Sequence, residues 1–145
     1  MKIDSKSQLV AFGIHGGASG IDIVSVEAKT HKLTPRDHLA IGMSSALLHL
    51  DWSLDSRYIQ VNSQAYELLF VDLETKQGVT ASVVKDVNWR TQTCKLGFPV
   101  QGIWPGADYT EVNSVARSHN GKILATTEDS GLVKLFRYPC TQEHA

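Results

Sequence analysis

The chain has 145 residues, 42% of them hydrophobic and 20% charged, with 14 Lys and Arg against 15 Asp and Glu. This composition is typical of a folded domain and argues against a disordered chain or a globally basic nucleic-acid-binding protein. Two cysteines are too few for a disulfide-stapled scaffold, and no apolar stretch approaches the roughly 20 residues of a membrane-spanning helix.

Short β-like runs separated by turn residues fill the chain in three groups. The first group, about residues 7–40, has apolar runs at 9–12 and 21–26, and the Gly-rich segment between them predicts a hairpin. The second group covers about residues 46–82 and the third about residues 112–140. Helical periodicity is weak throughout, so these patterns predict an all-β fold.

The second and third groups repeat one another. Residues 53–59 match residues 118–124, and both contain the turn Ser-x-Asp/Asn-Ser/Gly-Lys/Arg. Further along, Leu69-Phe70 matches Leu135-Phe136 if the alignment of the two groups is shifted by one residue. Repeated strand–turn–strand units are typical of β-propeller blades, so we predict about three blades of a WD-repeat propeller, with 83–111 as an insertion. A single small β-sandwich with coincidental turns is the alternative.

Six motifs are more specific than a generic repeat. They are His49–Ser63, Lys85–Trp89, Thr93–Phe98, Gly102–Pro105, Arg117–Lys122 and Val133–Cys140. In this order they resemble motifs of the C-terminal WD-repeat propeller of the echinoderm microtubule-associated protein-like (EMAP-like) family. The resemblance covers about residues 9–140, and it includes the insertion, which is not generic to WD repeats. Leu54 in place of the family's usual proline indicates a divergent member.

The resemblance implies a non-enzymatic protein-interaction scaffold that associates with microtubules and the cytoskeleton in the cytoplasm. One alternative is a ciliary or signalling WD-repeat scaffold without tubulin contact, and a more remote one is an enzyme or small-molecule site at the propeller channel. No cofactor, nucleic-acid or membrane partner is expected.

We expect the propeller ring to be incomplete. Residues 9–12 read as the second strand of a blade, so the chain is predicted to open inside a blade. About three blades leave open sheet edges, which a closed ring would cover. The chain is therefore expected to be a fragment of a longer protein, completed by that protein's remaining blades, or a piece that self-associates to close its ring.

A local basic stretch is the first candidate partner-binding site. Lys29, Lys32 and Arg36 lie close together in sequence between the first and second groups. A cluster of cations suits electrostatic contact with an acidic protein surface. The alternative is an ordinary solvated outer strand and loop.

An aromatic-bearing turn at the end of the insertion is the second candidate. It contains Trp104, Asp108 and Tyr109. Exposed aromatic side chains beside a polar neighbour suit protein interfaces. The alternative is that Trp104 packs against its own blade.

No catalytic, cofactor-binding or metal-binding residues are predicted. The chain has many Ser, His and Asp residues but no Gly-x-Ser-x-Gly nucleophile motif, and its histidines lack the spacing of metal ligands. We expect the Ser and Asp side chains of the repeated turns to tie strands together by hydrogen bonds. Trp52 and Trp89 are predicted to lie in the core, and Cys94 and Cys140 to be buried or half-buried thiols.

Overall fold

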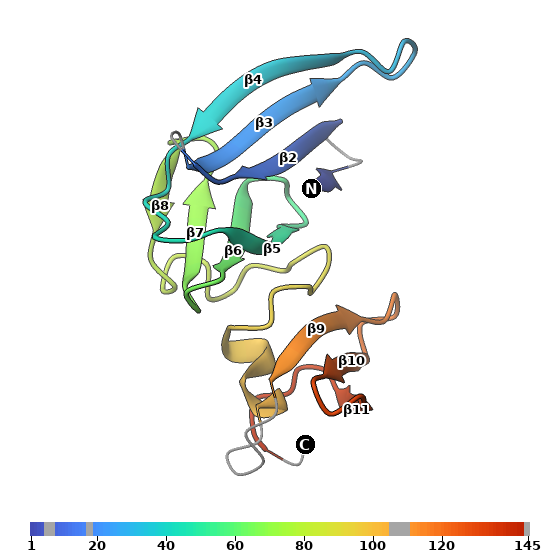
Figure 1. The fold of residues 1–145 in the computed structure, drawn as a ribbon. Helices are drawn as coiled ribbons and strands as arrows, with labels where there is room; N and C mark the ends of the chain where they lie inside the picture. The colour runs from blue at the N-terminus through green and yellow to red at the C-terminus, as the bar shows by residue number, and fades with distance from the viewer. Residues whose placement is uncertain (5–7, 17–18, 105–110, 144–145) are drawn as a thin grey trace. The chain divides into compact units, whose positions relative to one another are not determined.

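The structure is a computed structural model that describes residues 1–4, 8–16, 19–104 and 111–143. These residues form three antiparallel sheets within two compact units, residues 1–90 and 91–145 (Figure 1). The first sheet contains β1 (Lys2–Asp4), β2 (Leu9–Ile14), β3 (Gly20–Val26) and β4 (Leu33–Leu39) in chain order. The second contains β5 (Leu47–Trp52), β6 (Tyr58–Ser63), β7 (Leu68–Asp72) and β8 (Gln77–Val79), also in chain order. The third contains β9 (Val112–Arg117), β10 (Ile123–Glu128) and β11 (Val133–Arg137), and the 3-10 helix η1 (Phe98–Ile103) precedes it.

The prediction of an all-β, partial propeller is confirmed. Each sheet is an antiparallel meander in which strands adjacent in sequence are adjacent in space, as in a propeller blade. Within the part of the chain that is described, no helix has both the length and the apolar character needed to cross a bilayer.

The expectation that the chain opens inside a blade is wrong, because β1 supplies a strand before β2. Lys2 pairs with Ala11 and Asp4 pairs with Leu9 in antiparallel register. The sequence concealed this strand because it has only three residues and an inverted pattern. Its Ile3 side chain is 59% exposed, whereas Asp4 is fully buried.

The core of the first unit lies between its two sheets. Buried aliphatic and aromatic residues from both sheets form one cluster: Leu9, Ala11, Ile21, Ile23 and Leu39 from the first sheet, and Leu50, Trp52, Ile59, Val61 and Val71 from the second. Gly13 allows this close approach, because a Cβ atom there would lie 2.9 Å from the Cβ of Leu47. The Trp52 indole also donates a hydrogen bond of 3.2 Å to the Lys2 carbonyl. The two sheets of the first unit therefore share one core, and Trp52 and Trp89 are buried as predicted.

The second unit has its own core. Val100 and Ile103 of η1 pack with Val112, Val115 and Leu124 of the third sheet. Both cysteines are fully buried and neither forms a disulfide, which confirms that prediction. The insertion therefore contributes the 3-10 helix that covers one face of the third sheet.

The register of the second and third sheets corrects the one-residue slip in the predicted repeat. Tyr58 pairs with Asp72 in the second sheet, and Ile123 pairs with Arg137 in the third. Phe70 lies two residues before Asp72, and Leu135 lies two residues before Arg137. Phe70 therefore corresponds to Leu135, and the two repeats align without a shift of one residue. The matched Leu-Phe dipeptides were a coincidence of composition, and a slip of one residue would have placed every side chain of the strand on the wrong face.

Candidate functional site

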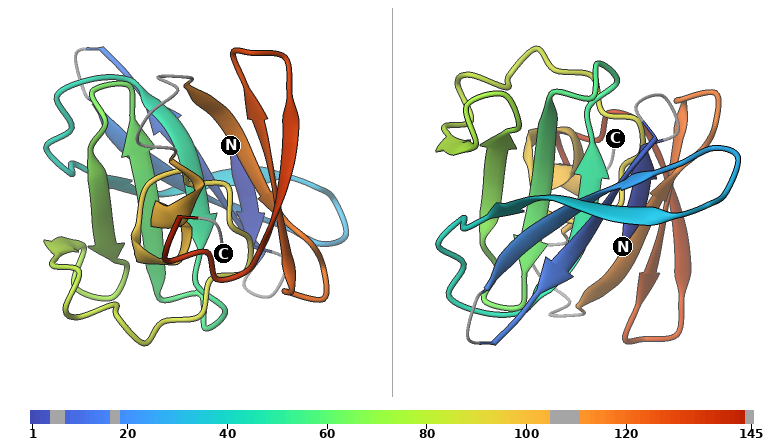
Figure 2. Two further views of the ribbon diagram at one scale, coloured as in Figure 1. Left: turned by 90° about the horizontal axis from the view of Figure 1, so that it is seen from below. Right: turned by 90° about the horizontal axis from the view of Figure 1, so that it is seen from above.

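The turn between β3 and β4 carries the first two predicted site residues. This hairpin projects beyond the end of β2, and the other views show the same projection (Figures 1 and 2). Its turn is closed by a 3.0 Å hydrogen bond from the Glu27 amide to the Lys32 carbonyl and a 2.8 Å bond from the His31 amide to the Glu27 carbonyl. Lys29 and Lys32 are exposed, and their ammonium groups form no ion pair with any described residue. The tip therefore presents two cations to solvent.

Arg36 lies apart from these lysines, on β4. It is four residues beyond Lys32, or roughly 13 Å along an extended strand. Its Nε is 3.4 Å from the carboxylate of Asp37, which also forms a 2.5 Å ion pair with Lys76 of the β7–β8 turn. The structure thus divides the predicted basic stretch into an unpaired tip and an ion-paired strand residue.

The second predicted site is described only in part. Trp104 is half-buried and packs against the core of the second unit. Its indole N–H donates a 2.9 Å hydrogen bond to the Lys95 carbonyl, and the Lys95 ammonium lies 5.8 Å from its ring centre. These contacts are those of a side chain that packs within its own unit. Asp108 and Tyr109 lie outside the described residues.

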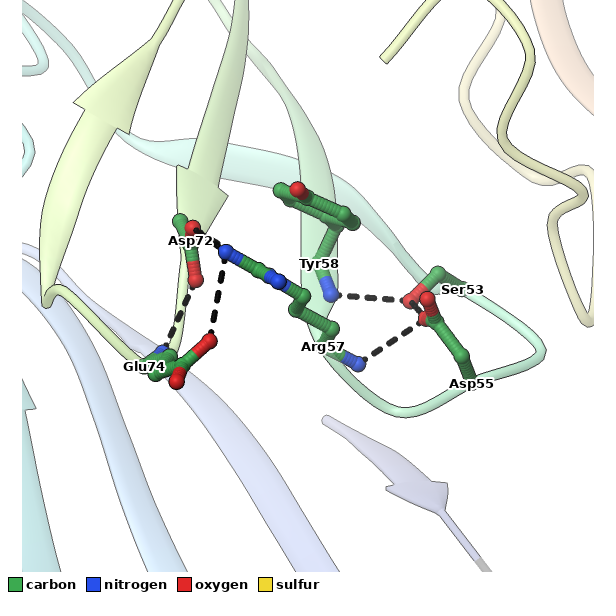
Figure 3. Close-up of polar contacts among 6 residues, drawn as sticks. All are labelled: Ser53, Asp55, Arg57, Tyr58, Asp72 and Glu74. Carbon is green, nitrogen blue, oxygen red and sulfur yellow. Dashed lines mark hydrogen bonds and ion pairs between the residues drawn. The ribbon is translucent and has the colours of Figure 1, made fainter. Parts of the chain in front are cut away.

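The polar residues of the β5–β6 turn form a closed hydrogen-bond network (Figure 3). The Ser53 hydroxyl donates to the Asp55 carboxylate at 2.5 Å and accepts from the Tyr58 amide at 2.8 Å. The same carboxylate oxygen accepts from the Arg57 amide at 3.1 Å. Burial raises the pKa of Asp55, but the hydrogen bonds from Ser53 and Arg57 outweigh it and hold that pKa below its ordinary value.

The β9–β10 turn repeats this network bond for bond. The Ser118 hydroxyl donates to Asn120 at 2.7 Å and accepts from the Ile123 amide at 3.0 Å, while the Lys122 amide donates to Asn120 at 3.1 Å. Neither serine hydroxyl is bonded to a histidine in these networks. The sequence prediction that these residues tie strands and turns together is therefore supported by geometry, and the arrangement is not that of an activated nucleophile.

An ion-pair cluster that sequence reasoning missed fixes the end of the second sheet. The Arg57 guanidinium lies 2.9 Å from Asp72 and 3.2 Å from Glu74, and it stacks over the Tyr58 ring (Figure 3). Burial alone would raise the pKa of Asp72, but hydrogen bonds from the Arg57 guanidinium and from the Glu74 amide have the larger effect and hold that pKa below its ordinary value. Arg57 and Asp72 are 15 positions apart in sequence, and only the pairing of β6 with β7 brings them together.

The third sheet has an exposed apolar face, also not identified from the sequence. Val133 and Leu135 of β11 are 69% and 70% exposed, and Ile123 of β10 is 45% exposed. In the second sheet the residue equivalent to Leu135 is Phe70, and its ring stacks on Trp89 at 6.1 Å. The same face is thus covered in one blade and open in the other.

Comparison with known proteins points to one family. Residues 1–145 match the family described as the echinoderm microtubule-associated protein second β-propeller. Echinoderm microtubule-associated protein-like 2 of Mus musculus is 53% identical over 106 residues, which are 72% of this chain and 16% of that protein. The 77 kDa echinoderm microtubule-associated protein of Lytechinus variegatus is 54% identical over 106 residues, which are again 72% of this chain and 16% of that protein. Echinoderm microtubule-associated protein-like 1 of Homo sapiens is 41% identical over 147 aligned positions, 100% of this chain and 18% of that protein. The chain therefore spans less than a fifth of the length of these relatives.

Proposed function

This chain belongs to the family of echinoderm microtubule-associated proteins, as part of their second β-propeller, and from this membership we propose that it acts as a non-enzymatic protein-interaction scaffold associated with microtubules. The observation that carries the proposal is the family match over the whole chain. The relatives are named as microtubule-associated proteins, which supports a place on the cytoskeleton in the cytoplasm.

The polar groups of the described turns support a role without chemistry. The hydroxyls of Ser53 and Ser118 are committed to hydrogen bonds that close turns. A scaffold instead binds through the shape and charge of a rigid surface, and the sheets of a propeller hold such a surface in place.

The tip of the β3–β4 hairpin is the proposed contact with tubulin. Lys29 and Lys32 offer two exposed cations without ion-pair partners among the described residues, and an acidic surface, such as we expect tubulin to present, would complement them. Because the net charge of the chain is only −1, its attraction to an acidic surface has to come from local clusters of this kind.

Co-sedimentation with microtubules at low and at physiological salt tests this contact. The wild-type chain is expected to pellet at low salt and less at higher salt, because salt screens exposed charges beyond about 8–10 Å. The double variant Lys29→Glu/Lys32→Glu should pellet several-fold less at low salt. Lys85→Glu changes one exposed cation away from the hairpin and serves as the control. If wild type does not pellet at low salt, tubulin is not a direct ligand of this segment, and the alternative of a scaffold without tubulin contact is favoured.

We also propose that a further blade covers the exposed face of the third sheet. That blade belongs either to a longer chain or to a second copy of this one. The proposal is supported by Val133 and Leu135, because large apolar side chains side by side on a sheet face normally pack against another layer. It is also supported by the second sheet, in which Phe70 at the position equivalent to Leu135 is stacked on Trp89.

Sedimentation equilibrium of the 145-residue chain tests self-association through this face. A mass that rises with concentration, and that Leu135→Lys returns to the monomer, is expected for a second copy. Leu132→Lys is the matched control, because Leu132 is also exposed but precedes β11. A wild-type chain that stays monomeric would exclude the second copy as the covering blade.

A further inference from the structure

The hydroxyl of Thr34, in the β3–β4 hairpin, takes no part in holding the fold together. The other hydroxyls of this hairpin are engaged, because Ser25 donates to the Thr34 carbonyl at 3.3 Å and Thr30 donates to the Glu27 carboxylate. The Thr34 hydroxyl forms no hydrogen bond with any described residue, and residues 33–36 are all exposed. A molecule in solution can therefore reach this hydroxyl without breaking a contact of the fold.

The strand that carries Thr34 lies at the outside of its sheet. Thr34 is the second residue of β4, which is the last strand of the first sheet, and within the described part of the chain only β3 pairs with it (Figure 1). A propeller ring closes by packing the faces of neighbouring blades, so the outermost strand of each blade stays at the rim. Thr34 is therefore expected to remain accessible in a complete ring as well.

A proline directly follows this free hydroxyl. Of the four prolines in the chain, only Pro35 comes after a serine or a threonine. Proline restricts the preceding residue to extended conformations, and β4 holds Thr34 in such a conformation. Protein kinases bind the residues around the accepting hydroxyl in an extended form, and the proline-directed class accepts proline at the next position, where it has no N–H to leave unpaired. The sequence and the conformation both suit a substrate of that class.

We propose that Thr34 is a phosphorylation site for a proline-directed protein kinase, and that its phosphate switches off the contact between the hairpin tip and an acidic surface. In the transfer, the Thr34 hydroxyl oxygen attacks the γ-phosphorus of ATP and forms a new O–P bond. The bond from that phosphorus to ADP breaks, ADP leaves with the electron pair, and the hydroxyl proton passes to a carboxylate base of the kinase. The switch rests on the proposed tubulin contact, whereas the modification does not.

The phosphate inverts the charge of this part of the hairpin. Residues 27–37 contain three Lys and Arg and two Asp and Glu, so their net charge is +1 with neutral histidine. A phosphate brings about −1.5 to −2 at pH 7, which makes the same segment negative. An acidic surface that attracts the unmodified hairpin then repels the modified one.

Two cations lie close enough to pair with the phosphate. Lys32 precedes Thr34 by two residues, so the two side chains lie on the same face of the extended chain, roughly 7 Å apart. Arg36 follows Thr34 by two residues, and its contact of 3.4 Å with Asp37 uses only Nε, which leaves other guanidinium N–H groups for phosphate oxygens. Lys32 would then be occupied within the chain and no longer available to a partner.

Kinase treatment of the folded 145-residue chain tests the modification. A mitogen-activated protein kinase with ATP and Mg²⁺ is the probe, and mass spectrometry locates the phosphate. We expect phosphate on Thr34, a rate at least tenfold lower for Pro35→Ala, and no labelling of this site in Thr34→Val, which keeps the shape of the side chain without its hydroxyl.

A free peptide of residues 28–40 is treated in parallel to show that the kinase accepts the sequence. The proposal is overturned if the peptide is labelled but Thr34 of the folded chain is not, because the strand would then hide the site. It is also overturned if neither is labelled, or if Pro35→Ala is labelled as fast as wild type.

Co-sedimentation with microtubules at low salt tests the switch. The phosphorylated chain should pellet several-fold less than the unmodified chain, and kinase-treated Thr34→Val should pellet as untreated wild type does. Thermal unfolding should be the same for the phosphorylated and unmodified chains, because the Thr34 hydroxyl has no partner to lose. If the phosphorylated chain pellets as well as the unmodified one, the switch is overturned and the tubulin contact stands. If neither pellets, the contact and the switch both fail, while the mass spectrum decides the modification by itself.

Discussion

Replacing Ser53 by alanine should destabilise the first unit strongly. Its hydroxyl is fully buried, accepts the Tyr58 amide at 2.8 Å and donates to the Asp55 carboxylate at 2.5 Å. Ser53→Ala leaves a backbone amide without its partner, which costs about 1–3 kcal/mol, and removes a hydrogen bond to a charged group, worth about 1.5–3 kcal/mol. Because the two effects overlap, we expect a loss of about 3 kcal/mol in the free energy of unfolding.

The repeated turn supplies a matched control. Ser118 makes the same two bonds, to the Ile123 amide at 3.0 Å and to Asn120 at 2.7 Å. Ser118 is only half-buried, and its partner Asn120 is neutral and exposed. Water can therefore replace the lost hydroxyl, so Ser118→Ala should cost about 1 kcal/mol, typical of an ordinary hydrogen bond.

Urea denaturation followed by tryptophan fluorescence measures both losses. Trp52 and Trp89 report on residues 1–90, and Trp104 reports on residues 91–145. Each midpoint should fall without a change in the denaturant dependence, because the surface exposed on unfolding is the same. Equal losses for Ser53→Ala and Ser118→Ala would refute the reasoning, since burial and the charge of the acceptor would then have no effect on otherwise identical networks.

Three further predictions concern charge, packing and the thiols. Burial alone would raise the pKa of Asp72, but its hydrogen bonds and its guanidinium partner have the larger effect and lower that pKa. The contribution of Asp72 to the free energy of unfolding is therefore fully present above about pH 4 and is lost as the pH falls through the lowered pKa. Asp72→Asn should flatten the acid limb of a plot of Tm against pH. Gly20→Ala should lower the free energy of unfolding by about 1–3 kcal/mol, because a Cβ atom there would lie 2.4 Å from a β4 carbonyl oxygen. Gly78→Ala is the control, since the nearest atom to its Cβ would be 3.8 Å away, and it should cost under about 1 kcal/mol when both variants are compared by thermal unfolding. Cys94 and Cys140 are fully buried, and burial raises the pKa of the Cys140 thiol. A thiol reagent should therefore label both cysteines only after unfolding, and rapid labelling of the native chain would contradict this burial.

The strand–turn–strand organisation could be read from the sequence because the interactions that create it are local. In each repeated turn, the serine bonds to a residue two positions away and to an amide five positions away. Interactions over so few residues leave a recognisable pattern of residue types. The polar networks around Ser53 and Ser118 were therefore correctly predicted as structural.

The candidate site was predictable only in part. Lys29, Lys32 and Arg36 are clustered in sequence, but β4 places Arg36 beside Asp37, away from the two lysines. The ion pair of Arg57 with Asp72 left no local signal, because only the pairing of β6 with β7 brings the two residues together. A sequence read one segment at a time does not show which segments meet.

The sequence by itself determined the fold class and the family, through repeated turns and through motifs carried by consecutive residues. The tertiary structure alone decided which strands pair and in which register. It revealed β1, in which Ile3 is exposed and Asp4 is buried, the inverse of the usual pattern. It also showed that the repeats align without the predicted shift of one residue, and this register places Leu135 on the exposed face of the third sheet. The physical reason is that side chains alternate between the two faces of a strand, so a shift of one residue exchanges core and surface, and only contacts between distant strands choose between the two.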